Sequence, residues 1–519
     1  NLSETEFLLT SFVTVIFAYI LKNIFILYFI NFRSHFEANC QKYFANKLYK
    51  KYLQNKYEFH IQNNSSVLLR NVTTETDNLK HATNASISFI AEVLIFIGIV
   101  TFLLIFNFYF TLILIMLLIF GGGFILFIKP KLKNWGNKRL LEQGLINKKV
   151  TDALQNIKII KLWRKDKRFI EIFEESNSKR AEMVRRLSFW GGVPKVFFET
   201  ITIIWISFFL ISTAFIGIDK SELFIYFTIY GLSALKIIPS CNLILNSIIT
   251  LQFSNPSLLK IISEIENSNL DKEIKLKETD EINLEFKSKL IFKDVNFSYP
   301  NNDKYVLEKI SFEFNKGDKI GVFGPSGSGK STLVELIIGL LKPTNGKIFL
   351  DEVNMLNHKS YSWRKKIGYI PQNVLLFDDN VINNITLQKD FEKLSSKKLE
   401  NVINRSKISN FLKNLPNGLN TNLGEKGLNI SGGQRQRIAI ARALFHEPEI
   451  LILDESTNQL DNNTENEILK DILSEFKDKT IIMISHDYSL LSECDQIIHL
   501  DQSKISKITK NEKENTNTN

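Results

Sequence analysis

Residues 319–340 read KIGVFGPSGSGKSTLVELIIGL. An apolar run ends at Phe323, residues 324–331 match the pattern GxxxxGK[ST], and a second apolar run of helical character follows. In such a loop the backbone N–H groups converge on a phosphate, and the N-terminus of the next helix adds positive potential. We therefore expect a strand, a phosphate-binding loop and a helix, in which Lys330 neutralises phosphate oxygens and Ser331 binds Mg²⁺.

A second motif lies at residues 450–455, ILILDE, where an apolar run ends in two carboxylates. Asp454 is placed to hold the shell of a Mg²⁺ ion, and Glu455 is placed to polarise an attacking water. Strands often end in acidic residues, so this pattern indicates little by itself. It gains weight from residues 431–434, SGGQ, which open a predicted helix and form a second N-terminus that suits a phosphate. One ATP molecule cannot easily use both loops of the same chain.

These motifs resemble those of the ATP-binding-cassette (ABC) transporters. Residues 431–434 are similar to the signature motif of that family, residues 458–461 to its D-loop and His486 to its switch histidine. Gln372 in YIPQN resembles the Q-loop glutamine, and Tyr299 in FSYP resembles the aromatic residue that stacks on adenine. In that family two cassettes face each other head to tail, so that each ATP lies between one phosphate loop and the signature motif of the other subunit.

The resemblance implies a complete set of site residues. The implied catalytic residues are Glu455, His486 and Gln372, and the implied Mg²⁺ ligands are Ser331, Gln372 and Asp454. The implied ATP-binding residues are Tyr299, Gly324, Ser326, Gly327, Gly329, Lys330, Ser331, Thr332, Ser431, Gly432, Gly433, Gln434 and Asp461. Two positions depart from the commonest family pattern: Ile430 stands where Leu usually precedes SGGQ, and residues 458–459, Asn-Gln, replace Ser-Ala in the D-loop.

Around these motifs, residues 290–505 alternate short apolar runs with helical stretches, which is typical of an α/β domain with a largely parallel sheet. We assign this range to a nucleotide-binding domain. Residues 251–289 are polar and of mixed charge and are interpreted as a linker. The tail, residues 506–519, is poor in apolar residues and is predicted to be disordered.

The first half of the chain has a different character, because its apolar residues gather in long runs. Residues 1–250 are predicted to form a membrane helical bundle whose five spans cover 7–30, 87–106, 108–128, 196–216 and 222–250. Lys and Arg crowd the segments 31–86 and 129–195, which places both on the cytoplasmic side and predicts that helices continue there as rods. An odd number of spans predicts a missing first helix if the complete chain begins in the cytoplasm.

The fused arrangement, membrane domain first, resembles exporters of the ABC family. That resemblance implies coupling helices, which we expect near residues 57–65 and 152–158, and rigid-body rocking of the bundle as the cassettes close on ATP. Because every catalytic motif is intact, we expect a second half-transporter as partner, most simply in a homodimer. The chain is accordingly interpreted as an ATP hydrolase coupled to transport across the cytoplasmic membrane.

Charge and cysteine content exclude other classes. The formal net charge is +10, but the basic residues flank apolar runs, which indicates a membrane protein and not a nucleic-acid-binding protein. Three cysteines without CxxC spacing indicate neither a disulfide framework nor a zinc site. A soluble ABC ATPase is excluded by the spans, and intact Glu455 and His486 argue against a non-transporting ATP-binding regulator.

The transported molecule is less well defined by the sequence. Residues 57–76 and 232–244 are similar to the exporters that flip lipid-linked oligosaccharides, which implies an amphipathic, lipid-linked substrate. Lys236 lies in an apolar span, where a charge is costly unless it faces a cavity or a partner, and a pyrophosphate-bearing lipid would suit it. Snorkelling of Lys236, or pairing with Glu92, is an equal alternative. Multidrug, lipid A and peptide export also remain open.

Overall fold

The computed structural model describes residues 3–216, 220–266, 284–300, 302, 304–355, 361–388, 396–424, 427, 430–455, 472–473, 476 and 479–510. The chain divides into two compact units, one formed by residues 1–55 and 59–271 and the other by residues 56–58 and 272–519. The first unit is helical, and the second contains both β-sheets. The architecture is thus a helical bundle followed by an α/β domain.

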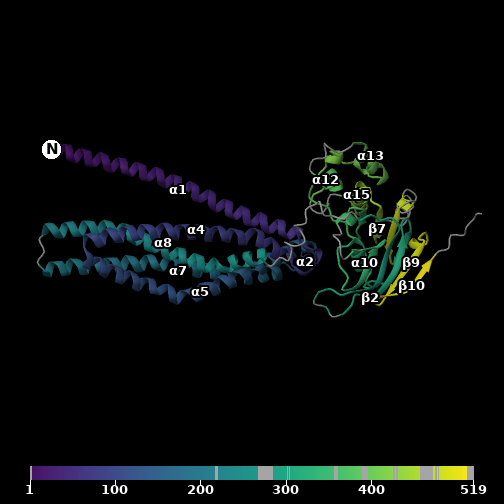
Figure 1. The fold of residues 1–519 in the computed structure, drawn as a ribbon, viewed down its shortest axis with the longest axis horizontal. Coiled ribbons are helices and arrows are strands. Elements are labelled where there is room, and N and C mark those ends of the chain that lie inside the picture. The colour runs from purple at the N-terminus through teal and green to yellow at the C-terminus, as the bar shows by residue number, and fades with distance from the viewer. Residues whose placement is uncertain are drawn as a thin grey trace, which may run out of the picture. The chain divides into compact units, whose positions relative to one another are not determined.

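Long helices build the first unit. Helices α4, α5, α7 and α8 run side by side along much of their length (Figure 1). The elements of this part of the chain are α1 (Glu4–Gln54), α2 (Tyr57–Gln62), α3 (Ser65–Arg70), the π-helix η1 (Asn71–Glu75), α4 (Thr76–Phe106), α5 (Phe108–Gln155), α6 (Ile157–Leu162), α7 (Asp166–Ile216) and α8 (Lys220–Glu266). The short helix α2 falls in the first region where a coupling helix is expected. Helix α6 begins at the end of the second region, because α5 continues to Gln155.

Several of these helices carry membrane-like sequence. Four described helices are long and apolar enough to cross a membrane: Thr5–Gln54, Ser65–Phe106, Asp166–Phe208 and Phe224–Glu266. In α1 the most apolar window is not buried at all inside the unit, which suits contact with lipid. The expected span 108–128 falls within α5, several of whose side chains lie outside the described residues. All four helices are longer than a hydrocarbon core of about 30 Å requires, so each continues beyond its apolar part.

Two boundaries expected from the sequence are wrong. The linker does not begin at residue 251, because α8 continues to Glu266 with Phe253 and Ile261 buried in the bundle. Apolar and polar residues both pack into the bundle here, since Ser254 and Ser257 are buried too, and composition alone does not distinguish such a helix from a linker. The tail is not disordered from residue 506, because β10 (Lys504–Lys510) pairs with β9 (Gln496–Asp501) and packs Ile505 against the domain core.

A buried group of charges ties the bundle together. Glu75 in η1 is fully buried and lies 3.5 Å from Arg70 and 3.4 Å from Arg139 of α5. Arg139 also donates to the hydroxyl of Ser257 in α8 at 2.6 Å. Glu75 and Arg139 together therefore join three segments that are far apart in the sequence. Gly144 lies beside them, and a Cβ there would come within 2.4 Å of the Arg70 guanidinium, so a larger residue would displace that side chain.

The second unit contains two sheets. A four-stranded antiparallel sheet has the order β2-β1-β4-β5, and a six-stranded sheet has the order β10-β9-β3-β8-β7-β6. Besides β9 and β10, the strands are β1 (Lys289–Phe297), β2 (Leu307–Asn315), β3 (Lys319–Phe323), β4 (Asn345–Leu350), β5 (Val353–Asn354), β6 (Ile367–Ile370), β7 (Ile450–Asp454) and β8 (Thr480–Ser485). In the larger sheet β6, β7, β8, β3 and β9 are parallel, and β10 is antiparallel.

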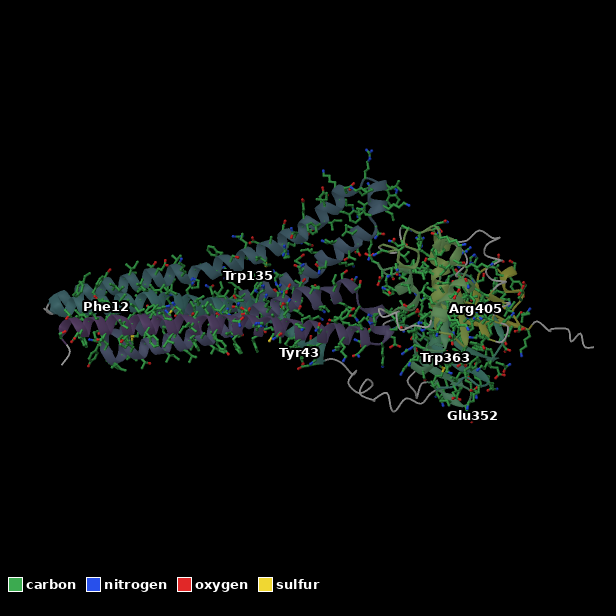
Figure 2. All side chains as sticks on the ribbon, turned by 90° about the horizontal axis from the view of Figure 1, so that it is seen from above. Phe12, Tyr43, Trp135, Glu352, Trp363 and Arg405 are labelled. Atoms are coloured by element: carbon green, nitrogen blue, oxygen red, sulfur yellow. The ribbon has the colours of Figure 1, made fainter. Side chains whose placement is uncertain are left out.

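Helices cover the parallel sheet. Helix α10 (Lys330–Ile338) packs with residues of both sheets in one apolar core, whereas α15 (Gly432–Phe445) belongs to a second core with α12 (Val381–Thr386). The other helices are α11 (Tyr361–Arg364), α13 (Ser396–Arg405), α14 (Ser409–Leu412), η5 (Gly418–Asn420) and η7 (Ser489–Leu491). Every residue of β7 and β8 is buried, as continuous apolar runs in a parallel sheet require. Trp363 of α11 is also fully buried and donates to the carbonyl of Ile337 at 2.8 Å (Figure 2).

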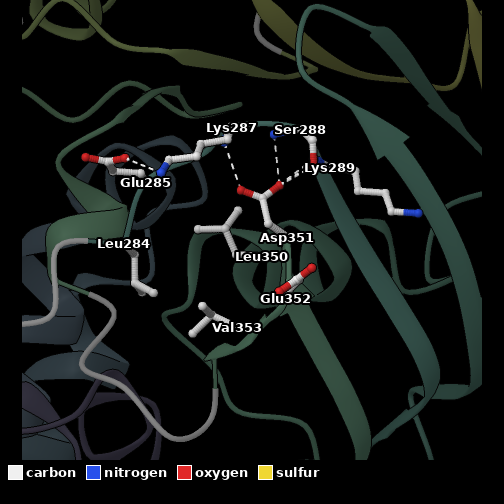
Figure 3. A pocket seen from close by; sticks show the side chains of 9 residues that line it. All are labelled: Leu284, Glu285, Lys287, Ser288, Lys289, Leu350, Asp351, Glu352 and Val353. Carbon is white, nitrogen blue, oxygen red and sulfur yellow. Dashed lines mark hydrogen bonds and ion pairs between the residues drawn. The ribbon is translucent and has the colours of Figure 1, made fainter.

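One aspartate, Asp351, binds the segment that leads into β1. Asp351 accepts hydrogen bonds of 2.7 to 2.9 Å from the backbone N–H groups of Lys287, Ser288 and Lys289, and one of 2.7 Å from the Ser288 hydroxyl (Figure 3). Burial of Asp351 opposes its ionisation, but these hydrogen bonds outweigh it and lower its pKa to about 2. The start of β1 is thereby fixed to the end of β4. Leu284 and Phe286 are already buried, so the folded domain begins before residue 290.

Candidate nucleotide site

The phosphate-binding loop connects β3 to α10 as expected. Gly327 and Gly329 have φ of +82° and +101°, a region that only glycine adopts without strain. A Cβ on Gly324 would lie 2.3 Å from the carbonyl oxygen of Leu500, so the loop approaches its neighbour too closely for any other residue. Lys330 is 7% exposed, and its ammonium donates to the carbonyl oxygens of Gly324 and Pro325 at 2.8 and 3.1 Å. The lysine is therefore held within its own loop.

Asp454 and Glu455 stand at the carboxyl end of β7 in different environments. Asp454 is buried, which raises its pKa, while a hydrogen bond of 2.9 Å from the Tyr369 hydroxyl acts in the opposite direction. Glu455 leaves the strand with φ of +41°, and its N–H donates to the carbonyl of Ile484 in β8 at 3.0 Å. This φ lies in the left-handed region, which few residues other than glycine adopt. The two acids are neighbours in sequence but have separate partners.

Glu455 is the point at which the predicted catalytic groups meet. The side-chain amide of Gln372 donates to its Oε2 at 2.6 Å, and the Lys330 ammonium lies 3.6 Å from its Oε1. Nδ1 of His486 lies 3.8 Å from the same Oε1. The four residues follow β6, β7, β3 and β8, whose carboxyl ends share one edge of the parallel sheet. Ligand sites of open α/β sheets lie at this edge.

The signature-like segment is built as a separate helix start. Ser431 caps α15: its hydroxyl accepts from the Gln434 N–H at 3.3 Å, and Gln434 Oε1 accepts from the Ser431 N–H at 2.9 Å. This capping box is exposed and, among the described residues, has no hydrogen bond or ion pair to the phosphate loop. Gly432 and Gly433 form the first turn behind it. The structure thus keeps the two predicted phosphate-binding segments apart within one chain.

Other predicted residues have simpler positions. The Tyr299 hydroxyl lies 3.2 Å from Oγ1 of Thr332, and its ring packs edge-on against Phe297. Ser326 and Ser331 are exposed on the loop and the first turn of α10. Asp461 and the rest of the D-loop segment lie outside the described residues. Lys236 is exposed on α8, while the Glu92 carboxylate accepts from the Ser240 hydroxyl at 2.7 Å.

The residues present fit a nucleotide phosphate and a Mg²⁺ ion. Oγ of Ser328 is buried within the loop and has no hydrogen-bond partner in the structure, which is a costly state that a phosphate oxygen would relieve. Ser331, Gln372 and Asp454 offer hydroxyl, amide and carboxylate oxygens, the ligand type that Mg²⁺ prefers. Tyr369 was missed by sequence reasoning, although it lies on the strand beside β7, where its hydroxyl reaches Asp454.

Comparison with known proteins assigns both parts of the chain to one family. The family model described as the ABC transporter transmembrane region matches residues 2–235, and the model described as ABC transporter matches residues 307–458. The chain belongs to the ABC transporters. Its membrane-like helices and its nucleotide site correspond to the two modules of that family, fused in one chain with the transmembrane region first.

Relatives of this ABC transporter chain are named for several functions. It is 42% identical over 219 residues to a multidrug resistance-like ATP-binding protein MdlA of Buchnera aphidicola, covering 42% of this chain and 37% of that one. It is 30% identical over 383 residues to a putative export ATP-binding/permease protein of Rickettsia bellii, covering 72% and 64%. It is 39% identical over 217 residues to an ATP-dependent lipid A-core flippase of Pseudomonas aeruginosa, covering 42% and 36%. The matches thus span less than two thirds of the length of these relatives.

A solved structure shares the fold of this ABC transporter chain. A bacterial Atm1-family ABC exporter with ATP bound superimposes with a TM-score of 0.83 at 22% sequence identity, over 97% of this chain and 88% of that one. The arrangement of helices and strands described above is therefore that of an ABC exporter.

Proposed function

We propose that this chain is a half-transporter that hydrolyses ATP to export or flip a substrate across the cytoplasmic membrane. The observation that carries the proposal is the meeting of Gln372, Lys330 and His486 around the Glu455 carboxylate, in a chain that also carries four long apolar helices. The carboxylate would orient and polarise the attacking water, and His486 would contact the terminal phosphate. Mg²⁺ held by Ser331, Gln372 and Asp454 would neutralise phosphate charge.

The active form is proposed to be a homodimer. Each catalytic motif is intact, and the capping box at Ser431 is separate from the phosphate loop of its own chain. A second copy placed head to tail would bring its Ser431 N-terminus to the nucleotide, where an exposed helix start favours an anion.

Helix α6 is proposed to be a coupling helix. The exposed apolar residues Leu162 and Trp163 at its end provide a contact surface of the kind that a coupling helix needs.

The proposed substrate is a lipid-linked oligosaccharide. Lys236 is exposed on α8 and forms no ion pair with another described residue, and Glu92 is hydrogen-bonded to Ser240. Pairing with Glu92 therefore has no support. Exposure of Lys236 fits both snorkelling and a cavity role, and we propose the cavity role toward a pyrophosphate. Lipid A and multidrug substrates are the second candidate, which the names of the relatives favour.

The test uses the full chain reconstituted in proteoliposomes. Lipid-linked oligosaccharide should stimulate ATP hydrolysis, and Lys236→Ala should abolish both this stimulation and flipping while basal hydrolysis persists. A matched control is Lys22→Ala, which removes another lysine of an apolar span, one that stacks on Tyr19. Stimulation by lipid A or by hydrophobic drugs, without stimulation by the oligosaccharide lipid, would contradict the proposed substrate but not the proposed transport function.

A further inference from the structure

Helices α5 and α7 line an open pocket of about 300 Å³ that the nucleotide chemistry does not use. It is lined by Trp135, Arg185, Arg186, Phe189 and Trp190. Trp135 is 8% exposed and forms the inner wall, whereas the Phe189 ring is 60% exposed at the rim. Figure 2 labels Trp135 on its long helix. The pocket combines aromatic walls with two guanidinium groups.

The charge of the pocket is only partly compensated. Arg185 binds Glu182 through two nitrogens, at 2.7 and 2.8 Å, and Nε of Arg186 donates to the same carboxylate at 2.7 Å. Two cations thus share one anion, which leaves a net charge of one. Both terminal nitrogens of Arg186 lack a hydrogen-bond partner among the described residues, and its guanidinium lies 5.6 Å over the Trp135 ring. The site is therefore poised to accept a further anion.

The pocket lies where the apolar part of the bundle ends. Ile128, the last residue of the predicted span in α5, belongs to the same apolar cluster as Trp135 and Ile249, and Trp190 packs against this cluster. Trp135 is seven residues beyond Ile128, a rise of roughly 10 Å along the helix. Exposed lysines at positions 129, 131 and 133 lie between them. Aromatic residues and cations at this depth are typical of the level of the lipid headgroups on the cytoplasmic side.

We propose that this pocket binds the phosphate headgroup of an anionic phospholipid from the cytoplasmic leaflet. Arg186 and Arg185 would hold the phosphate by charge-assisted hydrogen bonds, and Trp190 and Phe189 would contact the glycerol and upper acyl region. A basic pocket between membrane helices at this level suits such a lipid. The inference requires insertion in a membrane but neither a particular transported substrate nor ATP hydrolysis.

The experiment measures lipid binding to the purified full chain in detergent by native mass spectrometry. Phosphatidylglycerol and phosphatidylcholine with identical acyl chains are compared. Each basic residue contributes about fivefold to binding of anionic lipid, so Arg185→Gln with Arg186→Gln should weaken phosphatidylglycerol binding about 25-fold and leave phosphatidylcholine unchanged. The control is Lys179→Gln, which alters an exposed ion pair on the same helix and should retain binding.

Two further arms make the result decisive. Glu182→Gln removes the compensating carboxylate and should tighten phosphatidylglycerol binding. This variant tests the proposal independently if the double arginine variant fails to fold. Inorganic phosphate at millimolar concentration should not displace the lipid. Full displacement by phosphate would assign the pocket to a free anion, and equal lipid binding by the double variant and the lysine control would overturn the proposal. A preference for the lipid-linked oligosaccharide over phosphatidylglycerol would make the pocket a substrate site instead.

Discussion

Gln372 donates a hydrogen bond of 2.6 Å to the carboxylate of Glu455, although 83 residues separate them in the sequence. The contact links the segment after β6 to the end of β7, two neighbouring parallel strands. A shift of the segment that carries Gln372 would therefore change the hydrogen bond to Glu455. The position of the proposed water-activating group thus depends on a residue outside its strand.

Tyr369 is expected to tune Asp454. Tyr369→Phe removes the hydroxyl that stabilises the ionised carboxylate, so the pKa of Asp454, already raised by burial, should rise further. Asp454 holds Mg²⁺ only when ionised, so the acid limb of the pH profile of ATP hydrolysis should move to higher pH, with a several-fold greater Mg²⁺ requirement. Tyr305→Phe, which alters an exposed hydroxyl bonded to Asn345, is the control. An unchanged acid limb would contradict this role.

The motif residues could be predicted from sequence, and Tyr369 could not. Phosphate loops and strand-terminal acids have fixed local spacing, so Lys330, Asp454 and Glu455 stand out along the chain. A single aromatic residue in a strand has no such signal, because its partner is chosen by the pairing of β6 with β7. The same reason applies to Arg70, Glu75 and Arg139. In the sequence they resemble the surface charges of a polar helix. Only packing between the helices buries them together.

Asp351 should stabilise the protein in a defined pH window. Its folded pKa of about 2 lies below the ordinary value of 3.8, so its contribution is complete above pH about 4 and is lost as the pH falls toward 2. Asp351→Asn keeps a residue that tolerates the observed φ of +53° and removes the charge. The melting temperature of the variant should be lower than that of the wild type at pH 7, and the gap should shrink below pH 4. A gap that stays constant down to pH 2 would show that the charge is not involved.

Removal of the buried carboxylate of Glu75 should strongly lower the stability of the protein. Glu75→Gln leaves Arg70 and Arg139 without their anion inside the bundle, which we expect to cost about 3 to 5 kcal/mol of unfolding free energy. The matched control is Glu175→Gln, which alters an exposed pair with Lys179 and should have no measurable effect. Denaturation of the purified chain in detergent provides the comparison. Equal stability of the two variants would mean that the buried network contributes little.

The proposed homodimer predicts a specific cross-link. In a chain whose three native cysteines are replaced, cysteines at Ser326 and Ser431 should form a disulfide between two copies when ATP is trapped, and give a band of twice the 60.0 kDa chain mass. Both positions are exposed, so the reaction is accessible. The two single-cysteine variants are the controls. Absence of the double-mass band in membranes that contain only this chain would indicate a different partner.

The most direct test of the account is ATP binding and hydrolysis by Glu455→Gln. The substitution keeps the phosphate loop but removes the carboxylate that Gln372, Lys330 and His486 surround. We predict ATP affinity close to that of the wild type and hydrolysis slowed by at least about 100-fold, as expected for loss of a positioned base. Lys330→Ala should instead weaken ATP binding itself. Hydrolysis near the wild-type rate in Glu455→Gln would contradict the central role of this carboxylate.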